Sequence, residues 1–221
     1  MERLHAFVDA AFAFAVTLLV VSFDALPRTQ QDLIAALKHT PSFLASFLMI
    51  AKLWREHAHW SRLYARADGA AVTLSLALVA TVLIWIYPLR LLHDSFFAWL
   101  SGGWLPSEFL IDNWDALRFL FTCYGVLFCA VYLLLVAMHG HAWRHRESLC
   151  LDRAQRREVW IAMRLYSSMA MIGLISAASA HILPFERHSW LAPVPGLLYA
   201  TIAILVWLIH RQGATVNDTS R

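Results

Sequence analysis

Residues 3–23 read R-L-H-A-F-V-D-A-A-F-A-F-A-V-T-L-L-V-V-S-F, and this stretch determines the class of the protein. A secretory signal peptide has a basic start, no acid at its head and a cleavage site of small residues. Here Asp9 follows Arg3 at the head of the run, and the residues at 20–24 make a poor cleavage site. We therefore expect a retained helix that carries an acid into the membrane edge. An ionisable group there is costly, so it is expected to face protein or water.

The rest of the chain is typical of a polytopic membrane protein. Of its 221 residues, 60% are hydrophobic and only 15% are charged, which is unlike a soluble domain. A helical span needs about 20 apolar residues. We expect an all-α membrane protein, one domain over residues 1–221, with six spans at about 4–24, 41–60, 69–91, 116–140, 158–184 and 191–211. The second span has the weakest support, because Lys52, Arg55 and Glu56 lie in its second half.

The distribution of basic residues predicts the orientation. With six spans, both termini lie on one side of the membrane, together with the second and fourth connections. That side holds 13 of the 18 Lys and Arg residues. The positive-inside rule therefore predicts cytoplasmic termini in a multi-pass protein of the plasma membrane. Because these residues lie in loops beside the membrane, the net charge of +3 does not indicate nucleic acid as a partner.

The outer connections contain further signals. Residues 31–38 are expected to form a short helix, capped by Thr29 or Gln30. Pro88 is expected at the outer end of the third span, where a helix can stop at little cost. Residues 93–115 form the longest outer connection, which is amphipathic and is expected to lie on the membrane surface.

One face of the first helix has an unusual composition. At 3.6 residues per turn, this face carries Asp9, Ala10, Ala13, Phe14, Thr17, Leu18 and Val21. If several copies met around an axis, the face would form rings. Apolar rings can gate by dewetting, and a hydroxyl ring could partly replace the water shell of an ion. The alternative is an ordinary buried helix, with Thr17 bonding its own backbone.

The first helix also carries a recognisable motif. Arg3-x-x-x-Phe7-x-Asp9, followed by Thr17-Leu18-Leu19, resembles the R-x-x-x-F-S-D…T-L-L signature of the transmembrane protein 175 family, which are potassium-permeable channels. The likeness covers about residues 3–90. It includes Ser46-Phe47, Trp54-x-x-His57, Asp68 and Pro88, which are similar to family features of the second and third spans.

The resemblance implies an assembly and roles for particular residues. Prokaryotic members of the family are six-helix subunits that form tetramers, with the first helices lining the pore. Carried over by spacing from the motif acid, the constriction residue is Phe14 and the further pore rings are Thr17, Leu18 and Val21. A network that ties the first helix to the second would consist of Arg3, Asp9, Trp54 and His57, with Phe7 as part of the motif.

The chain also departs from the family pattern. Val8 replaces the serine of the motif, Ser22 replaces an acid at the end of the first helix, and Phe14 replaces an aliphatic constriction residue. Four Phe rings around an axis would block a pore more strongly than four Ile or Leu. We therefore expect a tight closed state that opens by rotation of the first helix.

These observations predict a passive, potassium-permeable cation channel. Its expected partners are membrane lipid, K⁺ and other monovalent cations, and further copies of itself, with no cofactor. The alternatives are an ion-coupled transporter, for which no inverted repeat is visible, and a non-conducting membrane scaffold. No catalytic motif indicates an enzyme. His139-x-His141 with His145 is not a convincing ligand pattern, so no metal site is expected.

Overall fold

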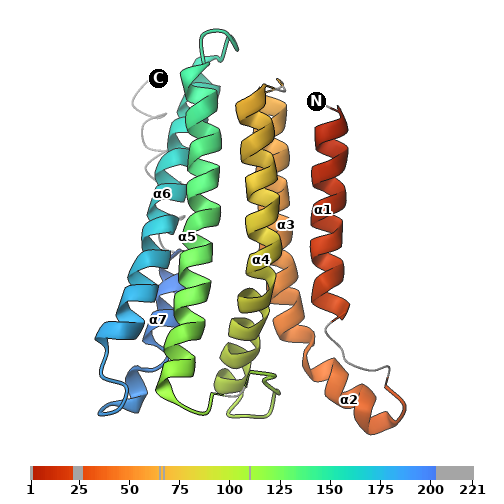
Figure 1. The fold of residues 1–221 in the computed structure, drawn as a ribbon, viewed down its shortest axis with the longest axis vertical. Coiled ribbons are helices and arrows are strands. Elements are labelled where there is room, and N and C mark those ends of the chain that lie inside the picture. Colours follow the sequence, from red (N-terminus) through yellow and green to blue (C-terminus); the bar gives the residue numbers. More distant parts are fainter. Residues whose placement is uncertain (1, 22–26, 65, 67, 110, 203–221) are drawn as a thin grey trace, which may run out of the picture.

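The computed structural model describes residues 2–21, 27–64, 66, 68–109 and 111–202. The regular secondary structure of these residues is helical. The long helices run along the longest axis of the molecule (Figure 1). They are α1 (Glu2–Val21), α3 (Thr40–Tyr64), α4 (Gly69–Leu100), α5 (Trp114–Arg144) and α6 (Arg153–Ile182). The short elements are α2 (Gln30–Lys38), η1 (Ser189–Leu191), α7 (Val194–Leu197) and η2 (Leu198–Ala200). The predicted all-α class is confirmed.

Several of these helices are suited to a membrane. Within the described residues, α4, α5 and α6 are each long and apolar enough to cross one, and α2 with α3, which meet at a bend of 42°, pass the same test as a pair. This gives three candidate spans, or four if the bent pair is one span. The predicted last span, at about 191–211, begins in short helical turns, and its residues 203–211 lie outside the described part of the chain. The number of six spans stays a prediction.

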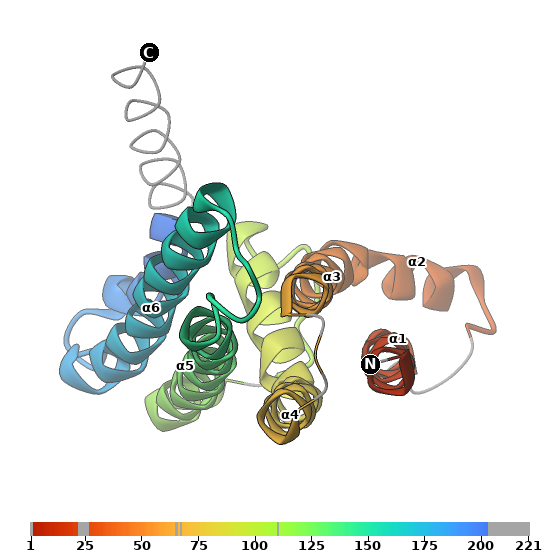
Figure 2. The ribbon, with the colours of Figure 1, turned by 90° about the horizontal axis from the view of Figure 1, so that it is seen from above.

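The helices pack in a row, with α1 at one edge. α5 pairs with α6 and α4, α3 packs on α4, and α1 contacts α3 and α4 (Figure 2). The backbones of α5 and α6 approach each other closely: a Cβ added at Gly125 would lie 2.6 Å from the carbonyl oxygen of Gly173. Small residues allow helix backbones to approach in this way in lipid. Only one side of α1 therefore packs against the other helices of the described subunit.

α2 confirms the expected short outer helix. Thr29 is its N-cap: the Oγ1 atom accepts from the Asp32 backbone N–H at 3.1 Å, and the Asp32 carboxylate accepts from the Thr29 N–H at 3.0 Å. This reciprocal capping box satisfies two backbone donors that the first turn leaves unpaired.

The expectation that the third helix stops at Pro88 is wrong, whereas the bounds of the third span stay a prediction. α4 continues through Pro88 to Leu100, so the expected surface segment at 93–115 begins as helix, and the connection shortens to residues 101–113. Proline removes one helical hydrogen bond. Leu89 and Asp94 beyond it are almost completely buried against neighbouring helices, and tertiary packing of this kind outweighs the local loss.

Candidate functional site

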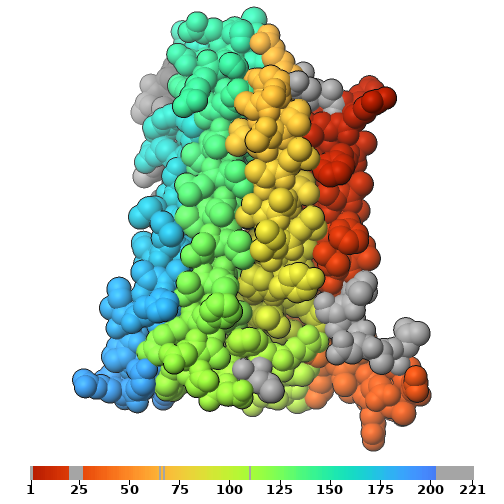
Figure 3. All heavy atoms as spheres, in the orientation of Figure 1, coloured from red at the N-terminus to blue at the C-terminus, as the bar shows by residue number. Residues whose placement is uncertain are grey.

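α1 has one packed face and one uncovered face. The packed face consists of Val8, Phe12, Ala15 and Leu19, each at most 4% exposed. The uncovered face carries five of the seven residues that helical spacing places together: Asp9, Ala10, Ala13, Phe14 and Thr17. Figure 3 shows α1 as a column along one edge of the molecule. The helical face derived from residue spacing is therefore the side of α1 that no helix of the described subunit covers.

The four predicted pore residues differ in how fully they lie on this face. Phe14 is 55% exposed, and Thr17 is exposed one turn further along the helix. Leu18 is half-buried and packs partly against the core, which places it at the edge of the face. Val21 ends α1, and its side chain lies outside the described part of the structure. The structure thus brings Phe14 and Thr17 together on the uncovered face.

The Thr17 hydroxyl donates one hydrogen bond within α1 and can still accept others. Its Oγ1 donates to the Ala13 carbonyl oxygen at 3.0 Å. This is the backbone bond of the buried-helix alternative, but the side chain is exposed. A hydroxyl that donates its proton to its own helix keeps two lone pairs as acceptors. Thr17 can therefore present oxygen to a cation beside the helix.

The predicted motif network is formed in part. Trp54 Nε1 donates to Asp9 Oδ1 at 2.8 Å, which joins α1 to α3. Arg3 and Phe7 are exposed on α1. Among the described residues, no ion pair joins Arg3 to Asp9. The Asp9–Trp54 bond is therefore the part of this network that the described contacts show.

His57 connects different helices from those that the resemblance implies. Its side chain is 2% exposed, and Nε2 lies 3.0 Å from Ser75 Oγ of α4. It lies one turn after Trp54 on α3, so both residues anchor this helix. His57 ties α3 to α4, whereas Trp54 ties α3 to α1.

Two of the three charged residues that weakened the second predicted span, Arg55 and Glu56, have partners. Tyr166 of α6 donates its hydroxyl to Glu56 Oε2 at 2.6 Å, and Arg55 lies 3.9 Å from Glu56 while its own side chain stays 72% exposed. A paired carboxylate is tolerable at partial burial because the partner offsets its desolvation. Nothing in the local pattern of α3 indicates a partner 110 residues away.

A second polar cluster, missed from the sequence, lies at the opposite end of α3 and α4. Asp94 is 1% exposed, accepts from the Ser42 hydroxyl and lies 3.8 Å from the guanidinium of Arg90. Arg90 also pairs with Glu108 at 2.6 Å, and His39 lies 3.4 Å from Asp94. Asp94 and Glu108 fall in the outer connection expected at 93–115, because the third span is expected to end before them.

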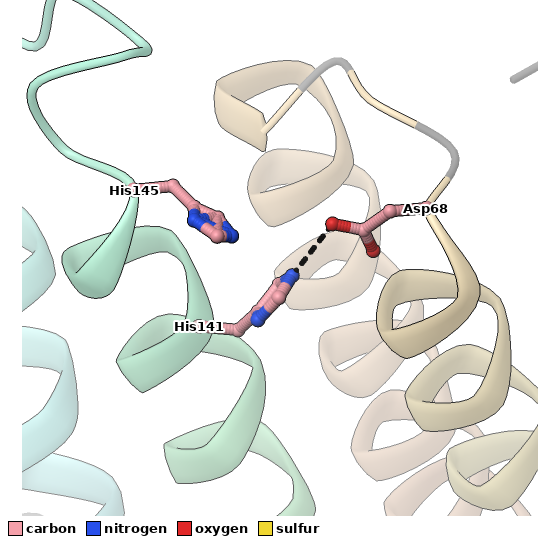
Figure 4. A group of neighbouring side chains, drawn as sticks. All are labelled: Asp68, His141 and His145. Atoms are coloured by element: carbon pink, nitrogen blue, oxygen red, sulfur yellow. Dashed lines mark hydrogen bonds and ion pairs between the residues drawn. The ribbon is translucent and has the colours of Figure 1, made fainter.

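A third cluster lies near the N-terminal end of α4. Asp68, His141 and His145 converge there from the α4 N-cap and the end of α5 (Figure 4). His141 Nε2 lies 3.0 Å from Asp68 Oδ2. His139, which precedes them in the sequence pattern, does not join this cluster: it is buried and bonds the Leu135 carbonyl oxygen at 2.9 Å.

The structure also contains a mostly apolar cavity of about 620 Å³. Its walls come from α4, α5 and residues 189–200, including Phe96, Tyr124 and Trp190. It is separate from the uncovered face of α1.

Comparison with known proteins supports the motif reading. Residues 3–87 match the family model described as "Endosomal/lysosomal potassium channel TMEM175". A protein of Marivirga tractuosa named "Potassium channel" is 28% identical over 182 residues, which are 78% of this chain and 73% of that protein. The resemblance to the transmembrane protein 175 family is confirmed. The TMEM175 match contains all nine residues of the predicted pore lining and motif network.

Solved structures extend the likeness to nearly the whole chain. A variant of the potassium channel MtTMEM175, in complex with a Nanobody-MBP fusion protein, superposes with a TM-score of 0.79 at 22% identity, covering 97% of this chain and 94% of that one. A lysosomal potassium-selective channel TMEM175 homolog from Chamaesiphon minutus superposes with a TM-score of 0.62 at 24% identity, covering 94% of this chain and 97% of that one. The likeness in fold therefore extends past residue 90, where the sequence likeness ended, to most of the remaining chain.

Proposed function

We propose that this protein is a potassium-permeable cation channel of the plasma membrane. Copies of the chain assemble as a tetramer around an axis lined by the uncovered face of α1, and K⁺ and other monovalent cations pass down their gradient without a cofactor. Both termini are cytoplasmic, as the distribution of basic residues suggests. The observation that carries the proposal is that the motif-bearing helix leaves Asp9, Phe14 and Thr17 uncovered within the subunit.

The chemistry of this face supports a water-filled path. Lipid would solvate neither the Asp9 carboxylate, which is exposed at one end of the face, nor the Thr17 hydroxyl. A polar path between subunits can solvate both. Ala10 and Ala13 are small enough to allow close approach of neighbouring helices. A ring of Thr17 oxygen acceptors could replace part of the hydration shell of a cation.

Phe14 supplies the constriction in this proposal. Four such rings at one level would form an apolar barrier, and apolar constrictions gate by dewetting. Because Phe14 is 55% exposed on its own subunit, its ring has room to swing aside without displacing the core of that subunit. Rotation of α1 would open the path.

Flux of K⁺ and of Na⁺ through the purified protein in liposomes tests the proposal, with Thr17→Ala as the variant. Thr73→Ala is the matched control, because Thr73 on α4 is also exposed and makes the same kind of bond, to the Gly69 carbonyl oxygen at 2.8 Å. We expect K⁺ flux from wild type and from Thr73→Ala, and a weaker preference for K⁺ in Thr17→Ala. Absence of flux of either ion from a protein shown to be tetrameric would contradict the proposal and favour a non-conducting scaffold.

A further inference from the structure

We propose that Asp68, His141 and His145 form a binding site for a divalent transition-metal ion, with Zn²⁺ as the best match. One ligand atom from each residue lies within 4.8 Å of the other two. Figure 4 shows the carboxylate and both imidazoles turned toward a common space between the start of α4 and the end of α5. The site lies between α4 and α5 and contains no residue of α1, so it adds to the proposed channel function rather than restating it.

The local structure explains why the three side chains converge. His141 and His145 are four residues apart at the end of α5, so they lie on one face of it. Asp68 is the N-cap of α4, and its Oδ1 atom is held by the Ala71 N–H at 2.8 Å. The Tyr64 ring lies 4.8 Å from the His141 ring and 5.9 Å from the His145 ring, centroid to centroid. The cluster is thus partly ordered before any ion arrives.

The donor set matches one class of metal. Two imidazole nitrogens and one carboxylate oxygen are typical ligands of Zn²⁺, which accepts three protein ligands with water in the fourth position of a tetrahedron. All three residues are half-buried, so water can reach that position. The Tyr64 hydroxyl, which donates to Asp68 Oδ2, would act as an outer-shell partner that orients the carboxylate.

The hydrogen bonding leaves a place for a cation. Among the described residues, the imidazole of His145 has ring contacts with Tyr64 and His141 but no hydrogen bond. A metal ion would give this ring a polar partner. Binding would also require the proton that His141 Nε2 shares with Asp68 to move to Nδ1 or to solvent, since a ligating nitrogen must be unprotonated.

The nearby cationic side chains have other partners. Arg66 donates to the Ser148 carbonyl oxygen at 3.1 Å, and Arg146 donates to the Trp143 carbonyl oxygen at 3.0 Å. Neither is ion-paired with Asp68 in the described structure. This distinguishes the site from the cluster of His39, Asp94 and Glu108, where Arg90 already lies against both carboxylates.

Titration of the purified full chain with Zn²⁺, after treatment with a chelator, tests this site. His145→Gln is the main variant, because it removes one ligand and leaves the Asp68–His141 bond and the Asp68 cap in place. Asp68→Asn is the second variant, since asparagine also caps helices well. His188→Gln is the control, because His188 is exposed in the connection between α6 and η1. Figure 1 shows this connection at the end of the molecule opposite to the start of α4.

The site predicts binding of one Zn²⁺ per chain, with affinity weaker by about tenfold or more in both ligand variants and unchanged in His188→Gln. Co²⁺ bound in place of Zn²⁺ should give the visible absorption of tetrahedral cobalt, and His145→Gln should abolish it. Equal Zn²⁺ affinity in wild type, His145→Gln and Asp68→Asn would overturn the proposal, as would wild type that binds no Zn²⁺. Neither readout depends on ion flux, so failure here leaves the channel proposal untouched.

Discussion

At the scale of single residues, Asp68 combines local and distant roles. It caps α4 through the Ala71 N–H and also accepts from Tyr64 and His141. Its position before an apolar run is visible in the sequence, and so is its likeness to a family acid. Its bond to His141, 73 residues away, is not visible, because a helix period does not specify which helices become neighbours.

The hydrogen bonds to Asp68 predict an acid-dependent contribution to stability. Hydrogen bonds from Tyr64 and the Ala71 backbone N–H, followed by His141, lower the pKa of Asp68 from 3.8 to about 2. A lowered folded-state pKa stabilises the protein above the unfolded value, and this contribution is lost as pH falls from about 4 to about 2. Wild type should therefore unfold at a higher temperature than Asp68→Asn at pH 6, and the gap should close toward pH 2.

Thermal unfolding in the presence of a chelator measures this difference without a contribution from bound metal. Asp68→Asn keeps a helix-capping side chain, so the gap reports the charge rather than the cap. A gap that stays constant down to pH 2, or no gap at pH 6, would contradict the interpretation.

At the scale of elements, apolar periodicity predicted helices better than it predicted their ends. The capping signal at Thr29 gave the start of α2 within one residue. The helix end predicted at Pro88 was wrong, because α4 continues through the packing of Leu89 and Asp94 against other helices. The face of α1 was predictable, since a single helix repeats its own period. The pairing of Glu56 with Tyr166 was not, because it joins α3 to α6.

The α5–α6 contact predicts a sharp cost for a single methyl group. In Gly125→Ala, the new Cβ would lie 2.6 Å from the Gly173 carbonyl oxygen and 3.1 Å from the Ala177 Cβ, so the helix backbones must separate. We expect a loss of about 1–3 kcal/mol in the free energy of unfolding, as for overpacked cores. Denaturant unfolding of the purified protein in detergent measures it.

Gly140→Ala in the same helix is the control. Its new Cβ would meet only the Met163 sulfur, at 3.9 Å, so this variant should be neutral or more stable by up to about 1 kcal/mol. Equal effects of the two substitutions would show that helix propensity, and not the approach of α5 to α6, determines the outcome.

At the scale of the whole molecule, the position of α1 is the important feature. It lies at one edge of the subunit, and its packed side accounts for Val8, Phe12, Ala15 and Leu19. The sequence indicated which side of this helix is distinctive but could not say which side the subunit covers. The uncovered side lies within residues 3–87, the range that matches the TMEM175 family model. Our proposal places other copies of the chain on that side.

If Phe14 is the constriction, shortening it should open the path. We predict that Phe14→Ala raises basal K⁺ flux in liposomes several-fold, because four small side chains no longer exclude water at that level. Phe119→Ala is the matched control, since Phe119 is also exposed, at 68%, but lies on α5. Unchanged or lower flux in correctly assembled Phe14→Ala would place the barrier elsewhere.

The most direct test of the central claim is whether a charged thiol reagent at position 17 stops the current. The measurement uses Thr17→Cys in a chain whose native Cys123, Cys129 and Cys150 are replaced, with Thr73→Cys on α4 as the control. A pore lined by the uncovered face of α1 predicts that labelling blocks K⁺ flux in Thr17→Cys and leaves Thr73→Cys conducting. Full flux through Thr17→Cys that is demonstrably labelled would contradict the account.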